Sequence, residues 1–456
     1  MSITRRSFAS LLGVGAIAPT ALWAQDDPVY EAVRSTLYGG RTDFEAGMTY
    51  LVERGNPDVV PALLTGMRYG RSREHDIAKV METLTGVRHG TDWFEWMLWQ
   101  ERNPQIIPHP SLVPFKREVL LGIDQNFDVF LRPEYLQRDR MKIRFEEISW
   151  GGVTKDGIPS LDNPELISAA RADYLKDDDL VFGVAINGDE RAYPLRIMGW
   201  HEMFNEVIGG VPVALAYCTL CGSGILFETQ VAGRQKPFVF GSSGFLYRSN
   251  KLMFDRETQS LWNQYTGKPV VGPLASSGIE LKQHPVVITR WDTWKKSHPD
   301  TRVLSLKTGY RRNYGSGVVY REYFASPNLM FPVLVDQSKF RQKDYVFAVR
   351  QFGAARAWPL AAFKGKPVIN DAIGGRALML MGDPDKRSVR AYERGAHQFR
   401  TTTDGVLLDE AGNKWTITEE ALVAPDGTQL PRVAGHISYW FAWDNYLGDA
   451  ASVYGG

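Results

Sequence analysis

The chain contains two cysteines, Cys218 and Cys221, which form a C-x-x-C motif followed by Gly222. A turn of this kind lets two thiolates converge on one ion, as in zinc knuckles. The same pair could instead cycle between dithiol and disulfide, or be inert core. Two cysteines in 456 residues make no disulfide framework. The motif therefore predicts a metal site first, with dithiol–disulfide chemistry and a structural role as the alternatives.

A histidine upstream of this motif, His201, is the expected third ligand. Two thiolates and one imidazole leave a fourth position open, which is typical of a catalytic metal centre. We expect copper or zinc, because soft ligands suit copper(I) and Met198, Met203 and Met253 are near in the sequence. If the segment after His201 is helical, Asn205 shares a helix face with it. A lone histidine is otherwise more often a satisfied polar residue than a ligand.

Three charged residues near the motif are candidate catalytic groups. Glu202 could act as a general base or orient a metal ligand. Asp255 and Arg256 follow a Gly-rich turn and could position a substrate, and the alternative for this pair is a turn with a structural salt bridge. The whole set predicts a metal-dependent enzyme, with oxidoreductase chemistry as one option. The alternatives are a non-catalytic ligand-binding protein with structural cysteines and a thiol–disulfide oxidoreductase.

The amino terminus has the order of an export signal. The pair Arg5-Arg6 with Phe8 precedes an apolar stretch over residues 11–22, and small residues then lead to Ala24. The paired arginines predict a twin-arginine signal over residues 1–24, with an ordinary secretory signal as the alternative. We therefore expect a periplasmic or secreted protein. No later apolar run is long enough to span a bilayer.

Charge and missing motifs narrow the function classes. The formal net charge of +1 gives no electrostatic case for binding nucleic acid or an anionic membrane. The sequence lacks a P-loop, a G-x-G-x-x-G between strand and helix, and a G-x-S-x-G elbow, which argues against nucleotide-dependent and serine-hydrolase chemistry. A small molecule or a peptide is the expected substrate.

Residues 27–150 have the pattern of a helical region. Asn56-Pro57-Asp58 is typical of a helix start, and the apolar residues over 59–67 then fall on one helical face. A second apolar stripe over 77–84 ends at Gly86. Paired short helices of this kind resemble helical-repeat units, and the region is a candidate surface for a protein partner.

From about residue 150 short apolar runs alternate with turn signals, which predicts a β-rich fold. Residues 180–186, followed by Asn187-Gly188, predict a strand entering a tight turn, and residues 211–217 predict a second strand. Three motifs also recur at one displacement of 165 positions (181 to 346, 191 to 356, 205 to 370). The matched segments are Val181–Val184 with Val346–Val349, Arg191–Leu195 with Arg356–Leu360, and Asn205–Gly210 with Asn370–Gly375.

These patterns predict an α+β protein in which a helical-repeat-like region precedes an internally duplicated, two-lobed β-rich domain. The first lobe is expected over residues 151–335 and a second, degenerate lobe over 336–456. The reactive residues of the first lobe have no chemical equivalent in the second: the aligned pairs are His201 with Lys366, Cys218 with Asp383, and Cys221 with Lys386. The repeat therefore predicts that shared residues are scaffold and that the active site belongs to the first lobe alone.

The order of several motifs resembles one known family, the bacterial and archaeal proteins catalogued as domain of unknown function thirty-one seventy-nine. The resemblance is strong over about residues 150–310 and weak over the second lobe, and the helical region lies outside it. It implies no particular biochemical activity. The segments that carry it are Lys155–Pro159, Arg191–Pro194, His201–Glu202 with Asn205, Tyr217–Gly222, Asp255–Arg256 and Ser260–Trp262.

Overall fold

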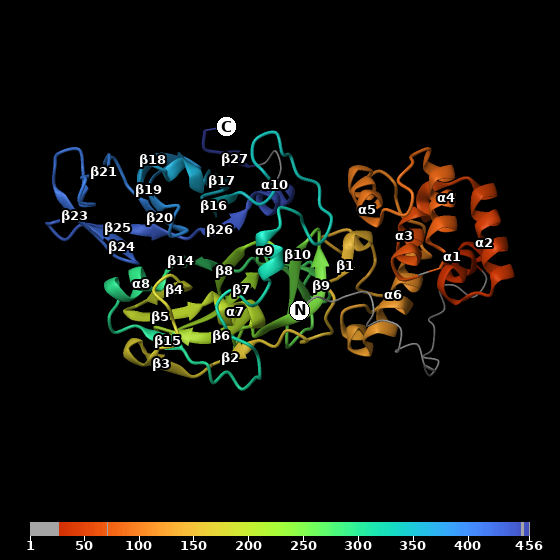
Figure 1. Cartoon of the computed structure of the whole chain (residues 1–456), viewed down its shortest axis with the longest axis horizontal. Helices are drawn as coiled ribbons and strands as arrows, with labels where there is room; N and C mark the ends of the chain where they lie inside the picture. The colour runs from red at the N-terminus through yellow and green to blue at the C-terminus, as the bar shows by residue number, and fades with distance from the viewer. Residues whose placement is uncertain (1–26, 71, 448–450, 456) are drawn as a thin grey trace.

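The computed structural model describes residues 27–70, 72–447 and 451–455, so the predicted export signal lies outside the described residues. Figure 1 shows helices α1 to α6 gathered at one end of the molecule, with the strands filling the remainder. In the described part of the chain, no helix is long and apolar enough to cross a membrane. The predicted helical region followed by a β-rich region is confirmed.

The helices of the amino-terminal region form where the apolar stripes predict them. Val60 and Leu63 are fully buried on α3, and Ile77 is fully buried on α4. The Asn56 side chain accepts a hydrogen bond from a backbone N–H in the turn before α3, and Gly86 ends α4 at a φ of +73°. The helix bounds are α1 (Pro28–Tyr38), α2 (Arg41–Arg54), α3 (Val60–Tyr69), α4 (Glu74–Thr85), α5 (Trp93–Arg102) and α6 (Leu112–Ile123).

The described strands form five sheets. The first has the order β1 (Ile148–Trp150), β9 (Phe240–Tyr247), β10 (Asn250–Asp255), β11 (Leu261–Asn263), β12 (Lys268–Val271). The second has the order β13 (Gln283–His284), β8 (Ser223–Glu228), β7 (Val211–Cys218), β6 (Met203–Ile208), β2 (Leu161–Asp162). The third has the order β14 (Val287–Arg290), β4 (Leu180–Ile186), β5 (Asp189–Pro194), β15 (Arg302–Leu304), β3 (Leu166–Ser168).

The last two sheets lie in the carboxy-terminal part of the chain. One has the order β26 (His436–Tyr439), β16 (Tyr345–Gln351), β17 (Ala354–Pro359), β27 (Ser452–Val453). The other has the order β18 (Val368–Ile373), β19 (Arg376–Asp383), β20 (Ser388–Glu393), β25 (Gln429–Val433), β24 (Ala421–Val423), β23 (Lys414–Ile417), β22 (Leu407–Leu408), β21 (Arg400–Thr401). Short helices connect the strands: α7 (Leu195–His201), α8 (Trp291–Ser297), α9 (Arg321–Ala325) and α10 (Trp440–Leu447).

Two groups of strands have matching hydrogen-bond registers. We call β4–β8 the upstream strand set and β16–β20 the downstream strand set. Each residue pair between neighbouring strands of the upstream set has its counterpart 165 positions later in the downstream set. Examples are Phe182–Tyr193 with Phe347–Trp358, Ile208–Val211 with Ile373–Arg376, and Cys218–Ser223 with Asp383–Ser388. The two sets pack against each other, since Phe182 and Phe347 belong to one buried hydrophobic cluster.

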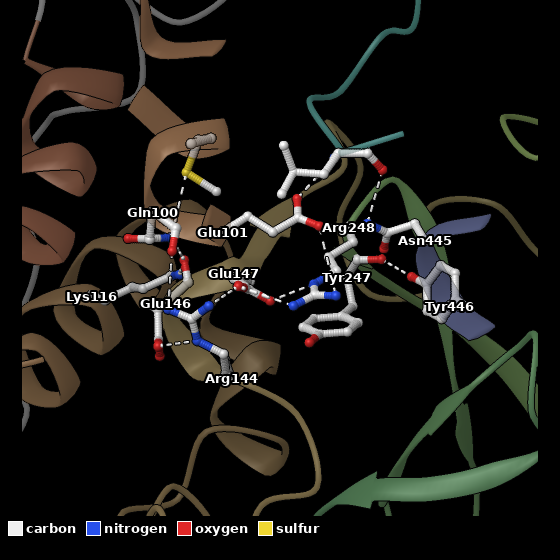
Figure 2. Close-up of polar contacts among 12 residues, drawn as sticks. Gln100, Glu101, Lys116, Arg144, Glu146, Glu147, Tyr247, Arg248, Asn445 and Tyr446 are labelled. Carbon is white, nitrogen blue, oxygen red and sulfur yellow. Dashed lines mark hydrogen bonds and ion pairs between the residues drawn. The ribbon is translucent and has the colours of Figure 1, made fainter. Parts of the chain in front are cut away.

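A buried polar network joins the helical region to the strands (Figure 2). At its centre is Arg248 in the β9–β10 turn, whose Nε donates to Glu147 at 2.6 Å and whose Nη1 lies 3.6 Å from Glu101 of α5. Asn445 of α10 donates to the same Glu101 carboxylate. Arg248 has a positive φ of 47°, which is uncommon for a residue with a side chain. The network therefore fixes the β9–β10 turn from the side of the helices.

Candidate functional site

The cysteine pair lies in the hairpin turn between β7 and β8. Cys218 is the last residue of β7, and the turn is closed by hydrogen bonds from Cys221 N to Cys218 O and from Gly222 N to Thr219 O, both 3.2 Å. Gly222 has a φ of +59°, which a glycine adopts without strain. The turn directs both thiols to one point, with Cys218 Sγ 2.6 Å from Cys221 Sγ. Both cysteines are free and buried.

Polar groups of the β9–β10 turn surround the Cys221 sulfur. Asn250 Nδ2 donates a hydrogen bond to Cys221 Sγ at 3.1 Å, and the thiol lies 3.5 Å from the carbonyl oxygen of Ser249. Gln264 accepts from the same Asn250 amide at 2.8 Å and so orients it. Burial is the main cause that raises the pKa of Cys221 well above its ordinary value, and the contact with Cys218 raises it further. The Asn250 hydrogen bond acts in the opposite direction and lowers this pKa. Cys221 is therefore a thiol at neutral pH.

Glu202 braces the cysteine turn rather than contacting a sulfur. Its carboxylate accepts from Thr219 Oγ1 at 2.8 Å and from Tyr320 OH at 3.2 Å, and Thr219 lies between the two cysteines. Lys251 Nζ lies 3.0 Å from the other carboxylate oxygen in an ion pair that is almost fully buried. Of the two roles predicted for Glu202, these contacts favour the orienting one.

His201 faces a different part of the fold from the one that the sequence predicts. Its Nδ1 lies 2.9 Å from the Pro159 carbonyl oxygen, which can only accept, so Nδ1 carries the proton. Its Nε2 then accepts from Tyr314 OH at 2.7 Å. Burial lowers the pKa of His201, so the ring is neutral. The segment after His201 is not helical, because α7 ends at His201 and Asn205 lies in β6, so the two residues do not share a helix face.

The predicted three-ligand group is consequently not assembled. Among the described residues, no group of three or more His, Cys, Asp or Glu side chains is placed to hold a metal ion. The 2.6 Å between the sulfurs is also shorter than the roughly 3.5–4 Å expected for two thiolates on one ion. Two of the predicted soft ligands, Met203 and Met253, do share a buried cluster with both cysteines.

Asp255 and Arg256 make the contacts of a structural turn. The Asp255 carboxylate accepts from Thr258 N at 2.6 Å and from Trp262 Nε1 at 2.9 Å. Arg256 forms a two-bond ion pair with Asp156 at 3.0 and 3.1 Å. Neither residue lines the cavity next to the cysteine turn. The arrangement matches the turn and salt bridge that the sequence left open as the alternative.

A cavity of about 870 Å³ lies beside the cysteine turn, between the upstream and downstream strand sets. Tyr217 and Gly222, which flank the cysteines, form one side of it, and Tyr345, Arg387 and Tyr439 form another. Sequence reasoning missed these three downstream residues, because only the fold brings them next to Gly222. It also gave Asn250 no role.

One family model matches the chain, and its description is "Protein of unknown function (DUF3179)". The match covers residues 155–450, so it includes both strand sets and extends well beyond the segment where the sequence motifs are strongest. The helical region lies outside the match. No curated protein and no solved structure matches the chain.

Proposed function

The chain belongs to the DUF3179 family, and we propose that it is an exported thiol–disulfide oxidoreductase whose centre is the Cys218–Cys221 pair. The observation that carries this proposal is the 2.6 Å separation of the two sulfurs within one hairpin turn. The two sulfurs need to approach by only about half an ångström to reach the roughly 2.05 Å of a disulfide bond. The export signal adds a compartment in which a disulfide can persist.

The proposed step transfers two electrons to a disulfide of a small molecule. The thiolate of one cysteine attacks the substrate disulfide, releases one substrate thiol and leaves a mixed disulfide. The second cysteine then displaces the other substrate thiol and closes the Cys218–Cys221 bond. Two protons and two electrons leave the protein in total. The raised pKa of Cys221 leaves little thiolate at neutral pH, so this cysteine suits the second step. That step is intramolecular, and the closeness of the two sulfurs compensates for the small fraction of thiolate.

Burial restricts what can reach the sulfurs. The exposed fraction of the residue is 2% for Cys218 and 0% for Cys221, so a folded protein cannot dock directly on either one. The cavity beside Gly222 brings a small molecule next to the turn. A small-molecule disulfide is therefore the favoured substrate class.

A redox titration tests the proposal. The mature protein is equilibrated in glutathione buffers of graded ratio, quenched in acid, denatured and alkylated, and intact mass counts the free thiols. We expect one transition from two free thiols to none, with a potential set by the pair. The variants Cys218→Ser and Cys221→Ser should never form the internal bond. Two free thiols at every ratio would exclude this function.

Copper(I) bound by the two thiolates is a second candidate, favoured by the shared buried cluster with Met203 and Met253. Metal analysis of protein purified without oxygen distinguishes it from the first. Copper at one equivalent, lost in Cys218→Ser, would support the metal centre. Metal-free protein with a redox-active pair would support the oxidoreductase.

We also propose that the matching registers reflect an internal duplication, and that Arg5 and Arg6 direct export by the twin-arginine route. The route reads the arginine pair itself. Replacing both residues with Lys should therefore leave the precursor in the cytoplasm, as cell fractionation would show. Unchanged delivery to the periplasm would contradict this route.

A further inference from the structure

The cavity beside the cysteine turn has the size of a small-molecule site. Its volume of about 870 Å³ falls in the range of roughly 300–1,000 Å³ that ligand pockets occupy. It has walls from both strand sets and from the segment 316–344 that precedes β16. Neither cysteine lines it, so a ligand could bind there whether or not the thiols are redox-active.

Two cations that line the cavity have no acidic partner among the described residues. Two ion pairs neutralise four of its charged residues: Arg196 with Asp179 at 2.8 Å, and Arg341 with Asp344 at 3.1 Å. Lys343 donates to two backbone carbonyl oxygens and its Nζ lies 3.4 Å from the centroid of the Tyr323 ring, and Arg387 forms no ion pair within the described residues. The remaining acid of the lining, Asp178, is exposed. An anion entering the cavity would therefore meet uncompensated positive charge.

These cations stand beside a pair of stacked aromatic rings. Tyr345 and Tyr439 stack with their centroids 4.7 Å apart, and the hydroxyl of Tyr345 lies 3.1 Å from that of Tyr439. The Arg387 guanidinium lies 4.3 Å from the Tyr345 centroid, and Lys343 Nζ lies 5.8 Å from the Tyr439 centroid. Flat aromatic walls, hydroxyls and cations together suit a ligand that has a ring and a negative charge.

Arg387 occupies a backbone conformation that disfavours side chains. Its φ is +53°, and the residue 165 positions earlier, Gly222, has a φ of +59°. Glycine adopts this region freely, whereas arginine adopts it at a cost in free energy. The downstream strand set carries an arginine at a position where its upstream counterpart is glycine, and the arginine side chain lines the cavity.

We propose that this cavity binds an aromatic organic anion, with Arg387 and Lys343 contacting its acidic group and Tyr345 and Tyr439 contacting its ring. A carboxylate, sulfonate or phosphate on an aromatic ring has the required chemistry. The cavity is the same one that would admit a small-molecule disulfide, but this assignment rests on the charges and rings of its lining and not on the thiols.

The test uses two ring-matched probes on the mature full-length protein. Isothermal titration calorimetry measures the binding of 2-naphthoate and of its neutral isostere 2-naphthamide. We expect 2-naphthoate to bind saturably and about tenfold more tightly, because charge-assisted hydrogen bonds are stronger than neutral ones. Arg387→Gln and Lys343→Gln should each weaken 2-naphthoate binding about tenfold and barely change 2-naphthamide binding. Arg387→Lys, which keeps the charge, should retain most of the affinity.

Lys386→Gln is the matched control. Lys386 precedes Arg387 in the same turn but pairs with Asp383 at 2.9 Å and does not line the cavity. It should bind 2-naphthoate like the native protein, as should Cys218→Ser. The proposal is overturned if 2-naphthoate does not bind saturably, binds no more tightly than the amide, or loses as much affinity in Lys386→Gln as in Arg387→Gln. Loss of binding in Cys218→Ser would place the ligand at the thiols and also overturn it.

Discussion

The upstream and downstream strand sets place different chemistry on the same turn. Upstream, the β7–β8 turn buries two thiols with their sulfurs 2.6 Å apart. Downstream, the β19–β20 turn has Asp383 and Lys386 at the matching positions, and these form a part-exposed ion pair at 2.9 Å. Both turns begin at the same register pair, Cys218–Ser223 and Asp383–Ser388. The chemistry of the turn therefore changes without a change in the strands that hold it.

Residues that match between the sets keep their contacts as well as their identity. Asn205 brackets the backbone of Phe240, donating to its carbonyl at 2.9 Å and accepting from its N–H at 2.8 Å. Asn370 makes the same two bonds to Phe399, at 2.7 and 2.9 Å. Asn205 joins β6 to β9 of a neighbouring sheet, and Asn370 joins β18 to the residue before β21 at the other end of its own sheet, which a reactive residue would not need to do. The comparison supports the view that shared residues are scaffold and that unshared residues carry function.

The largest expected effect comes from removing the asparagine that makes these two hydrogen bonds in each strand set. Asn205→Ala should destabilise the fold by about 3 kcal/mol, because it leaves a buried backbone N–H and C=O without partners. Asn370→Ala should cost only about 1–1.5 kcal/mol, because Asn370 is half-buried and water can replace part of the bracket. Urea unfolding of the two variants measures the difference. Equal losses would mean that the two brackets do not differ in burial as described.

A second pair of substitutions tests the residue with a positive φ in each of the two turns, Gly222 upstream and Arg387 downstream. Gly222→Ala should destabilise by about 1–2 kcal/mol, because a Cβ at φ +59° is strained and would lie 3.1 Å from the Tyr439 ring. Arg387→Gly should leave stability unchanged or raise it by up to about 1 kcal/mol, since it removes the same strain and loses one cation–π contact. Thermal unfolding tests the opposite signs. A loss in Arg387→Gly as large as that in Gly222→Ala would show that Arg387 is a structural residue.

Local patterns predicted the elements, whereas long-range contacts decide the site. The turn at Asn187-Gly188 has φ values of 50° and 76°, as the residue types require, and the stripe around Leu63 is buried. The sequence groups His201 with the cysteines because it precedes them in the first lobe and, like them, has no chemical equivalent at the matching position of the second. Its actual partners, Pro159 and Tyr314, lie 42 and 113 positions away, and no local rule identifies them. The cavity beside Gly222 was unpredictable for the same reason.

Lys343 should make the binding of an anion in the cavity depend on pH. Burial lowers the pKa of Lys343 to about 8, so its ammonium is charged below pH 8 and neutral above. Binding of 2-naphthoate should weaken several-fold between pH 7 and pH 9, and Lys343→Arg should remove this dependence. The groups facing Lys343 are the rings of Tyr323 and Tyr439, with Arg341 and Asp344 paired to each other. The pKa of each ring hydroxyl is raised, so neither titrates in this range. A flat profile in the native protein would contradict the role of Lys343.

The smallest expected effect concerns the hydrogen bond from Asn250 to Cys221. The downstream turn has no equivalent bond, because Lys386 stands there in place of the cysteine. Asn250 Nδ2 donates to Cys221 Sγ and lowers the pKa of that thiol. Asn250→Ala should therefore raise it, and the alkylation rate of the folded protein should reach its midpoint at a higher pH. Any change in access to the sulfur would alter the plateau rate instead, so the midpoint isolates the electrostatic effect. Gln264→Ala should shift the midpoint less, because it frees the Asn250 amide without removing the donor. A midpoint that stays in place or falls in Asn250→Ala would show that this hydrogen bond does not stabilise the thiolate.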